Sequence, residues 1–191
     1  MGSNGFLKFR QKMQKAALRE FGKNIYPLWG NQNAKIVSIS QAPSLSVIKY
    51  QKPFFDKSGQ RLRREWYKVS DEVFYNPDNF YFTAIGKAFP GKNKKGGDNK
   101  PDYNWANRWL KKELSFLSPK LFLVVGRVAA EFFFSKKDFT ELVFADQELN
   151  GKPAIVLPHP SPVNIKWFKD HPDFEKKRLP VIRKYIHLSL K

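Results

Sequence analysis

Four short apolar runs, each followed by a turn, are the feature that most constrains how this chain can fold. They are AKIVSIS at 34–40, FYFTAI at 80–85, KLFLVVG at 120–126 and PAIVLP at 153–158. The runs are continuous rather than alternating, which is typical of strands covered on both faces, as in a parallel sheet. Segments with helical spacing lie between them. The pattern predicts an α/β fold, a three-layer α/β/α sandwich around a central, mostly parallel four-stranded sheet.

Helical spacing of apolar residues is clearest in four segments. An N-terminal helix is predicted over 6–21 and another over 104–117. A third follows the third apolar run directly, at 127–134, and a C-terminal helix is expected from about 173 to 190, where Pro180 breaks it or opens its last segment. Because there is no internal repeat and no long linker, we expect a single domain over 1–191.

The charge of the chain indicates its partner. Lys and Arg total 35 against 17 acidic residues, a formal net charge of +18, while 41% of residues are hydrophobic. A folded domain with such a field attracts polyanions, so nucleic acid is the leading partner and a membrane surface the second. A basic charge that serves solubility alone is the remaining interpretation.

Other classes are excluded by what the sequence lacks. Cysteine is absent, which rules out disulfides, thiolate metal sites and a Cys nucleophile. No apolar stretch approaches the ~20 residues needed to cross a bilayer, and the N-terminus lacks the apolar core of a signal peptide. We therefore expect a cytoplasmic protein, associated with the nucleoid if it is bacterial, with no membrane partner.

The segments after the four runs are candidate site loops. They are QAPS at 41–44, GKAFPG at 86–91, GR at 126–127 and HPSPVN at 159–164. In a parallel sheet, ligands bind beyond the carboxyl ends of the strands, so these loops should meet at one edge. His159 stands out among them, because proline fixes its own φ and restricts the residue before it. Such an imidazole can be held where negative charge develops.

Five motifs in order carry a family resemblance: SQAPS, QKPFFDKSGQRL, YFTAIGKAFPG, SPKLFLVVGRVAAEF and HPSPVN. From about residue 34 to 165 the chain resembles the uracil-DNA glycosylase superfamily, with spacing closest to its thermophile-type iron–sulfur branch. The resemblance implies hydrolysis of the bond between a damaged base and deoxyribose, in base-excision repair. It also implies damaged DNA as the partner, single- or double-stranded, with the base pulled out of the stack. Nothing demands more than a monomer.

The resemblance also implies roles for individual residues. His159 would hydrogen-bond the base oxygen as negative charge builds, and Gln41 would hold the water. The implied base pocket is Ala42, Pro43, Ser44, Phe54, Thr83 and Ala84. The implied DNA contacts are Ser58, Gly59, Lys87, Lys92, Ser161, Val163 and Asn164, with Val163 or Ile165 as the wedge that fills the gap left by the base.

At three positions the sequence departs from the family pattern. Gln41 stands where the iron–sulfur branch has a carboxylate, and an amide can orient a water but cannot take its proton. Ala84 stands where an asparagine would read uracil, so strict uracil specificity is not supported. Ala88 and the region of Asn107 stand where cluster cysteines would be, so we expect no iron–sulfur cluster, no other metal and no cofactor. Trp105 and Trp109 would fill that volume.

Three functions stay open at this point. The leading one is a monofunctional DNA glycosylase acting on uracil or a related deaminated base. The second is a catalytically weak or inactive DNA-binding member of the same superfamily. The third, a hydrolase of free nucleosides or nucleotides, explains a pocket but not the charge. The basic loop at 86–104, with Lys87, Lys92, Lys94, Lys95 and Lys100, would track phosphates or form a solvated surface.

Overall fold

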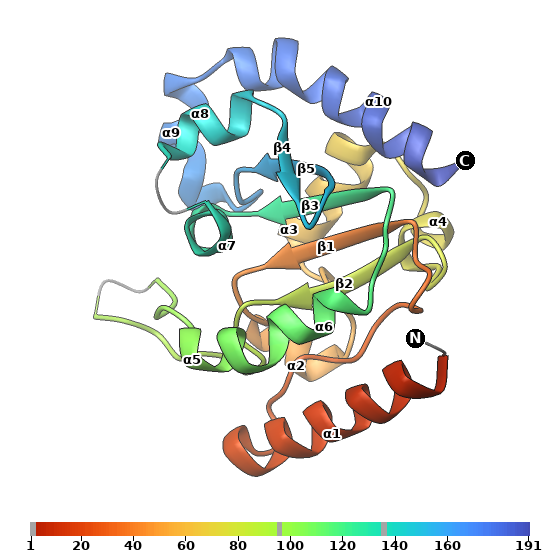
Figure 1. The fold of residues 1–191 in the computed structure, drawn as a ribbon. Coiled ribbons are helices and arrows are strands. Elements are labelled where there is room, and N and C mark those ends of the chain that lie inside the picture. Colours follow the sequence, from red (N-terminus) through yellow and green to blue (C-terminus); the bar gives the residue numbers. More distant parts are fainter. Residues whose placement is uncertain (1–2, 95–96, 135–136) are drawn as a thin grey trace.

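The computed structural model describes residues 3–94, 97–134 and 137–191, in which helices and strands alternate (Figure 1). The strands are β1 (Ile36–Ser40), β2 (Phe80–Ala84), β3 (Leu121–Val125), β4 (Gln147–Leu149) and β5 (Lys152–Leu157). The α-helices are α1 (Ser3–Phe21), α2 (Leu45–Tyr50), α3 (Lys57–Gln60), α4 (Asp71–Tyr75), α5 (Tyr103–Trp105), α6 (Lys111–Ser115), α7 (Arg127–Phe133), α8 (Phe139–Phe144), α9 (Ile165–Asp170) and α10 (Leu179–Leu190). Three π-helical segments, Arg61–Tyr67, Ala106–Leu110 and Phe174–Arg178, and one 3₁₀ turn, Pro162–Asn164, adjoin them.

In the described part of the chain these strands form one sheet, ordered β2-β1-β3-β5-β4. The first four run parallel and β4 pairs antiparallel with β5, so the sheet is mostly parallel as predicted but has five strands rather than four. The extra strand has no apolar pattern. Its signal is the Asn150-Gly151 dipeptide, whose two residues have φ of 52° and 71° and form a tight hairpin turn.

Both faces of the sheet are covered, and β2 shows how. Tyr81 packs on Phe6 of α1 and donates a hydrogen bond to Glu113 of α6 at 2.7 Å. The next residue, Phe82, points to the opposite face and packs on Phe74 of α4, with ring centroids 4.9 Å apart. Because successive side chains of a strand alternate between faces, one apolar run supplies both interfaces. This confirms the predicted three-layer sandwich.

The two terminal helices extend the layers. α1 begins at Ser3, earlier than the expected residue 6, and buries Phe9 and Met13 in a small cluster with Trp105. At the C-terminus the expected helix is a π-helical segment followed by α10, which has Pro180 in its first turn. That position needs no backbone N–H, so the proline opens the helix instead of breaking it.

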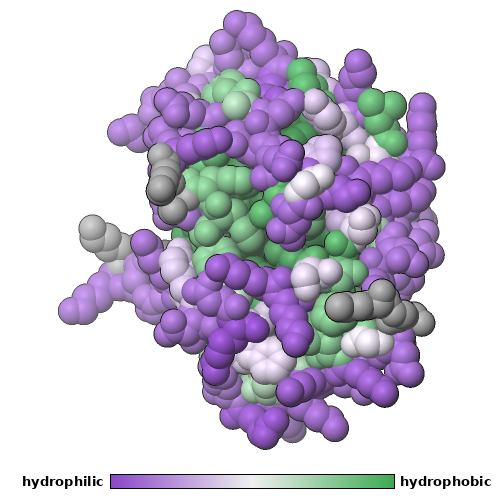
Figure 2. All heavy atoms as spheres, in the orientation of Figure 1, coloured by the Kyte–Doolittle hydropathy of each residue, from purple (hydrophilic) through white to green (hydrophobic). Residues whose placement is uncertain are grey.

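The molecular surface is mostly hydrophilic, as expected from the high content of Lys and Arg. The face in Figure 2 is hydrophilic over most of its area, with apolar side chains near its centre, in the region of α7 and β3. Among the described residues, no helix is both long enough and apolar enough to cross a membrane.

One prediction from the sequence is wrong at the level of a side chain: Lys87 is buried, not on a DNA-binding surface. Its ammonium lies 3.0 Å from a carboxylate oxygen of Glu113 and 2.6 Å from the hydroxyl of Thr83. Glu113 also accepts hydrogen bonds from Tyr81 and Thr83. A buried charge requires a partner, and here Glu113 provides it between α6 and β2. The lysine therefore holds the loop after β2 to the helical layer.

This network leads to a stability prediction. Replacing Glu113 with alanine should lower the free energy of unfolding by about 3–5 kcal/mol, because it leaves a buried ammonium unpaired. Urea denaturation followed by circular dichroism measures the change. The control is Glu20→Ala, which breaks the exposed pair with Arg108 and should cost less than about 1 kcal/mol. Equal costs for the two variants would contradict the role given to Glu113.

Candidate active site

The carboxyl ends of β1, β2, β3 and β5 meet at one edge of the sheet, as predicted. Ser40 of β1 is in register with Ala84 of β2, and Val125 of β3 with Leu157 of β5. The loop after β1 is fixed by the N–H of Gly86, which donates to the carbonyl of Gln41 at 2.9 Å. The candidate loops are therefore held by the sheet itself.

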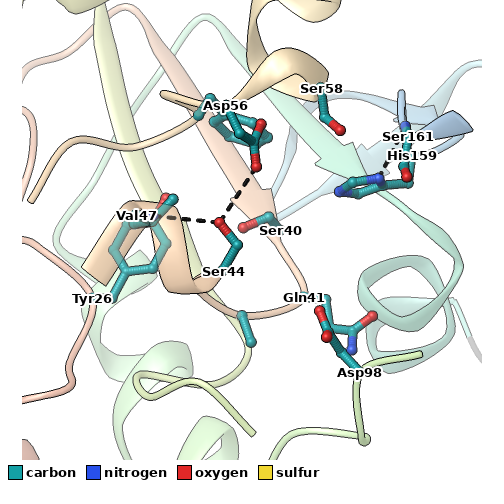
Figure 3. Close-up of a pocket in the computed structure, with 12 residues that line it drawn as sticks. Tyr26, Ser40, Gln41, Ser44, Val47, Asp56, Ser58, Asp98, His159 and Ser161 are labelled. Atoms are coloured by element: carbon teal, nitrogen blue, oxygen red, sulfur yellow. Dashed lines mark hydrogen bonds between the residues drawn. The ribbon is translucent and has the colours of Figure 1, made fainter. Parts of the chain in front are cut away.

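Between these loops lies a pocket of about 200 Å³. Figure 3 shows side chains entering it from several segments far apart in sequence. The lining residues are Tyr26, Ser40, Gln41, Ala42, Ser44, Val47, Phe54, Asp56, Ser58, Asp98, His159 and Ser161. Gln41, Phe54 and His159 therefore border a single cavity, together with Ala42 and Ser44.

His159 projects into this pocket and is held from behind. The backbone N–H of Ser161 donates to its Nδ1 at 3.2 Å, and the side-chain amide of Asn164 donates to its carbonyl oxygen at 2.8 Å. Gly126, at φ 93°, lies close beneath: a Cβ there would be 3.6 Å from the Cβ of His159. Because Nδ1 accepts a hydrogen bond, we infer that the neutral ring carries its proton on Nε2, which points into the pocket.

The charge of His159 is set by competing effects. Burial lowers the pKa of its imidazole below the ordinary value of 6.5, and the carboxylates of Asp56 and Asp98 act in the opposite direction. Burial has the larger effect, since it disfavours the cation. The ring is therefore a neutral hydrogen-bond donor near neutral pH.

Phe54 forms an apolar wall of the pocket. It has a left-handed backbone conformation with φ of 50°, and its carbonyl accepts hydrogen bonds from Arg63 and Tyr75, each at 3.2 Å. Gly59 packs so closely that a Cβ there would lie 1.8 Å from the carbonyl oxygen of Phe54. Gly59 thus has a packing role in the structure, where the sequence had indicated a DNA contact.

Gln41 lies on the other side of the pocket, next to Asp98 (Figure 3). Its side-chain N–H donates to the carbonyl of Asn99 at 3.0 Å, which ties the loop after β1 to the basic loop. The amide is thereby oriented, with its oxygen as the atom that can accept a hydrogen bond from water.

Two carboxylates in the pocket were missed by the sequence analysis. Asp56 caps α3 by accepting from the N–H of Gly59 at 2.9 Å, and its other oxygen lies 3.4 Å from the hydroxyl of Ser44. Asp98 pairs with Lys92 at 2.7 Å. The first has a sequence signal, since Asp is one of the residues preferred at the N-cap of a helix. The second has none, because only the folded loop brings it to the pocket.

The remaining predicted residues divide between the pocket, a neighbouring hollow and the rest of the molecule. Ser58 and Ser161 line the pocket, and Lys92, Val163 and Asn164 line an adjoining hollow that shares Gln41, Asp98, His159 and Ser161 with it. Outside both hollows lie Pro43, Thr83 and Ala84. Thr83 is directed at the buried network and Ala84 is fully buried. Lys94 and Lys100 are exposed, and Lys95 lies outside the described residues.

The residues near the expected cluster positions do not fit an iron–sulfur cluster. Ala88 lines a hollow with Phe21 and Trp105, and the chain has no cysteine to supply a thiolate. Trp105 is fully buried and contacts both Phe21 and Trp109, with ring centroids 5.2 and 5.5 Å away. Among the described residues, no group of three or more acidic or histidine side chains is arranged to hold a metal ion.

Comparisons with known proteins point to one family. The sequence profile of the Uracil DNA glycosylase superfamily matches residues 27–183. A type-4 uracil-DNA glycosylase from Saccharolobus solfataricus is 27% identical over 127 residues, which span 66% of this chain and 56% of that protein. The chain thus spans little more than half the length of this relative. A solution NMR structure of a candidate uracil DNA glycosylase from Methanosarcina acetivorans has a TM-score of 0.48 and 18% identity, covering 85% of this chain and 98% of that one.

The hydrogen bond at Nδ1 leads to a spectroscopic prediction. Long-range ¹H–¹⁵N NMR should find His159 as the Nε2–H tautomer at pH 7, and its titration should centre below 6.5. The unfolded chain would take up this proton first, so the stability that the neutral ring provides is complete above pH 6.5. That stability is lost as the pH falls through the lower folded pKa. An Nδ1–H tautomer would contradict the assignment.

Proposed function

Because the chain belongs to the uracil DNA glycosylase superfamily, we propose that it is a monofunctional DNA glycosylase. It hydrolyses the N-glycosidic bond of uracil or a related deaminated base in DNA, without a cofactor. The observation that carries the proposal is the neutral His159, which presents an N–H to a pocket that Gln41 and Phe54 also line.

His159 stabilises the departing base. As the bond between C1′ and the base nitrogen breaks, its electron pair stays on the base, and negative charge reaches the base oxygens. The Nε2–H donates a hydrogen bond to one of these oxygens. A neutral donor suits this task because it is already in place before charge develops. The ring is fixed by Ser161 and Asn164, so little reorganisation accompanies the reaction.

The sugar reacts with water held on the side of the pocket that Gln41 lines. The oxygen of the Gln41 amide holds the attacking water, whose oxygen bonds to C1′ and whose proton passes to solvent or to the released base. Asp98, which lies beside Gln41 in the pocket lining, supplies the negative charge that Gln41 lacks and stabilises the oxocarbenium-like sugar electrostatically. The products are a free base and an abasic site.

The flipped base stacks on Phe54, a contact that discriminates weakly between bases. Ala84 offers no hydrogen bond and is buried, so polar reading of the base falls to Ser44 and Asp56 in the pocket. A carboxylate accepts but does not donate, which favours bases that present an N–H to it. Specificity is therefore broader than for uracil alone.

The DNA backbone is held around the pocket mouth. Ser58 and Ser161 line the pocket, Lys92 lines the adjoining hollow, and Lys94 is exposed on the basic loop. Val163 is 87% exposed at the tip of its turn, an exposure that suits a wedge inserted where the base has left the duplex. All these groups come from one chain, so a monomer is sufficient.

A second function has specific support. Gln41 stands where the iron–sulfur branch has a carboxylate, and its side-chain N–H donates to the carbonyl of Asn99. The side chain of Ala84 cannot form a hydrogen bond with a base. These features favour a DNA-binding member of the superfamily with weak or no catalysis. The two proposals differ in one outcome, the appearance of abasic sites.

The activity test uses labelled oligonucleotides carrying uracil, hypoxanthine or xanthine, both single- and double-stranded. Alkali-labile abasic sites should form with at least one of them. His159→Ala should lower the rate about 10²–10³-fold, because one preorganised donor to a developing anion is lost. Gln41→Ala should lower it less, since water remains able to enter.

The control is His187→Ala, an exposed histidine on α10, which should keep the wild-type rate. Salt-sensitive binding with no abasic sites from any substrate would favour the second function. Wild-type activity in His159→Ala would contradict the assigned role of the imidazole.

The basic loop leads to a prediction about salt. Log affinity for DNA should fall linearly with log salt, by about 0.9 per phosphate contact. Lys94→Gln with Lys100→Gln should reduce this slope by roughly 1.8. The control is Lys120→Gln with Lys191→Gln, which should keep the wild-type slope. Both lysines lie near the amino end of β1, where Lys35 contacts the backbone of Lys120 and of Leu190. Titrations by fluorescence anisotropy at several salt concentrations give the slopes. An unchanged slope in the loop variant would show that this loop does not contact DNA.

A further inference from the structure

The exposed aromatic side chains of this protein are gathered in one place. The sequence has 18 Phe, 7 Tyr and 5 Trp, and nearly all of those described are buried or half-buried. Two are exposed, Tyr50 at 51% and Phe55 at 37%. They contact each other, with ring centroids 4.7 Å apart and an angle of 48° between their planes. The two exposed rings therefore form a single aromatic surface.

Two lysine side chains lie beside this pair. The ammonium of Lys49 lies 5.1 Å from the centroid of Tyr50, and that of Lys52 lies 5.6 Å from Phe55 and 3.9 Å from Tyr75. Cation–π contact of this kind places positive charge beside the aromatic faces. We call Tyr50, Phe55, Lys49 and Lys52 the aromatic–basic patch.

The patch is joined to the base pocket through the chain. Phe55 lies between Phe54 and Asp56, which both line the pocket, and Tyr50 ends α2, whose first turn is capped by the pocket residue Ser44. The backbone there is fixed, because Tyr75 donates a hydrogen bond to the carbonyl of Phe54 at 3.2 Å. The patch thus follows directly in the chain from residues that line the pocket.

Exposed aromatic rings with adjacent lysines are the combination that binds single-stranded nucleic acid. Each unpaired base can stack on a ring, and each phosphate can approach an ammonium. In a duplex the bases are already stacked on one another and cannot use such rings. An apolar protein partner would use the rings but would have to bury the lysine charges unpaired, which is costly.

We propose that the aromatic–basic patch binds an unpaired base next to the target nucleotide, so that the protein prefers single-stranded DNA or single-stranded segments. This inference takes DNA as the ligand from the proposed function, but it does not depend on base release. It addresses strand preference, which the catalytic residues leave undetermined.

The test measures binding of undamaged DNA, so that catalysis plays no part. Fluorescence anisotropy compares a short oligothymidine with a duplex of the same length, at fixed salt. Tyr50→Ala with Phe55→Ala should weaken single-strand binding about ten-fold or more, in line with the loss of a stacked base. Duplex binding should change less than about two-fold. Tyr50→Phe should keep the wild-type affinity, because its ring remains.

Controls separate stacking from other effects. Tyr50→Leu with Phe55→Leu keeps apolar area without aromatic faces and should not restore binding. Val181→Ala with Leu188→Ala removes exposed apolar side chains from α10 and should leave binding unchanged. Thermal melting verifies that each variant is folded.

The outcomes are distinct. Equal losses on single and double strands, full recovery with leucine, or unchanged single-strand binding in the alanine variant would each overturn the proposal. Loss of single-strand binding in a protein that releases no base would support the patch while contradicting the proposed glycosylase activity.

Discussion

Parallel pairing of four strands is the constraint on which the rest of the structure depends. It places Ser40, Ala84, Val125 and Leu157 at one edge, so that the loops after these strands meet around a single pocket. Parallel strands need long crossovers, and here the crossovers cover both faces of the sheet with helices. A shift in strand register would move every one of these loops at once.

Around this sheet, two groups of polar side chains are held by hydrogen-bond partners within the protein. Glu113 gathers Lys87, Thr83 and Tyr81 behind β2, while backbone and side-chain amides hold His159 at the pocket. The first group is a buried charge pair that fixes the loop after β2. The second leaves one N–H directed at the cavity. Similar hydrogen-bonding chemistry thus stabilises the fold in one place and prepares a donor in the other.

The departures from the family pattern define what is individual about this protein. The volume where cysteines would bind a cluster is bordered by Phe21 of α1 and by Trp105, whose rings contact each other. In the pocket, Asp56 and Asp98 supply carboxylates that the motif position of Gln41 lacks. Exposed rings beside the pocket add a surface suited to unpaired bases. The fold is that of the superfamily, whereas the side chains at these positions differ from the family pattern.

The sequence by itself determined the sandwich, the converging loops and the imidazole between prolines, because apolar periodicity and proline geometry are local properties. The tertiary structure decided which side chains share the cavity. Lys87 looks in the sequence like one more lysine of a basic loop, yet it is buried, since its partner Glu113 lies 26 residues away. Asp98 likewise reaches the pocket through a folded loop, and β4 exists because β5 offers it an edge. Contacts between residues distant in sequence leave no periodic signal, so spacing could not reveal them.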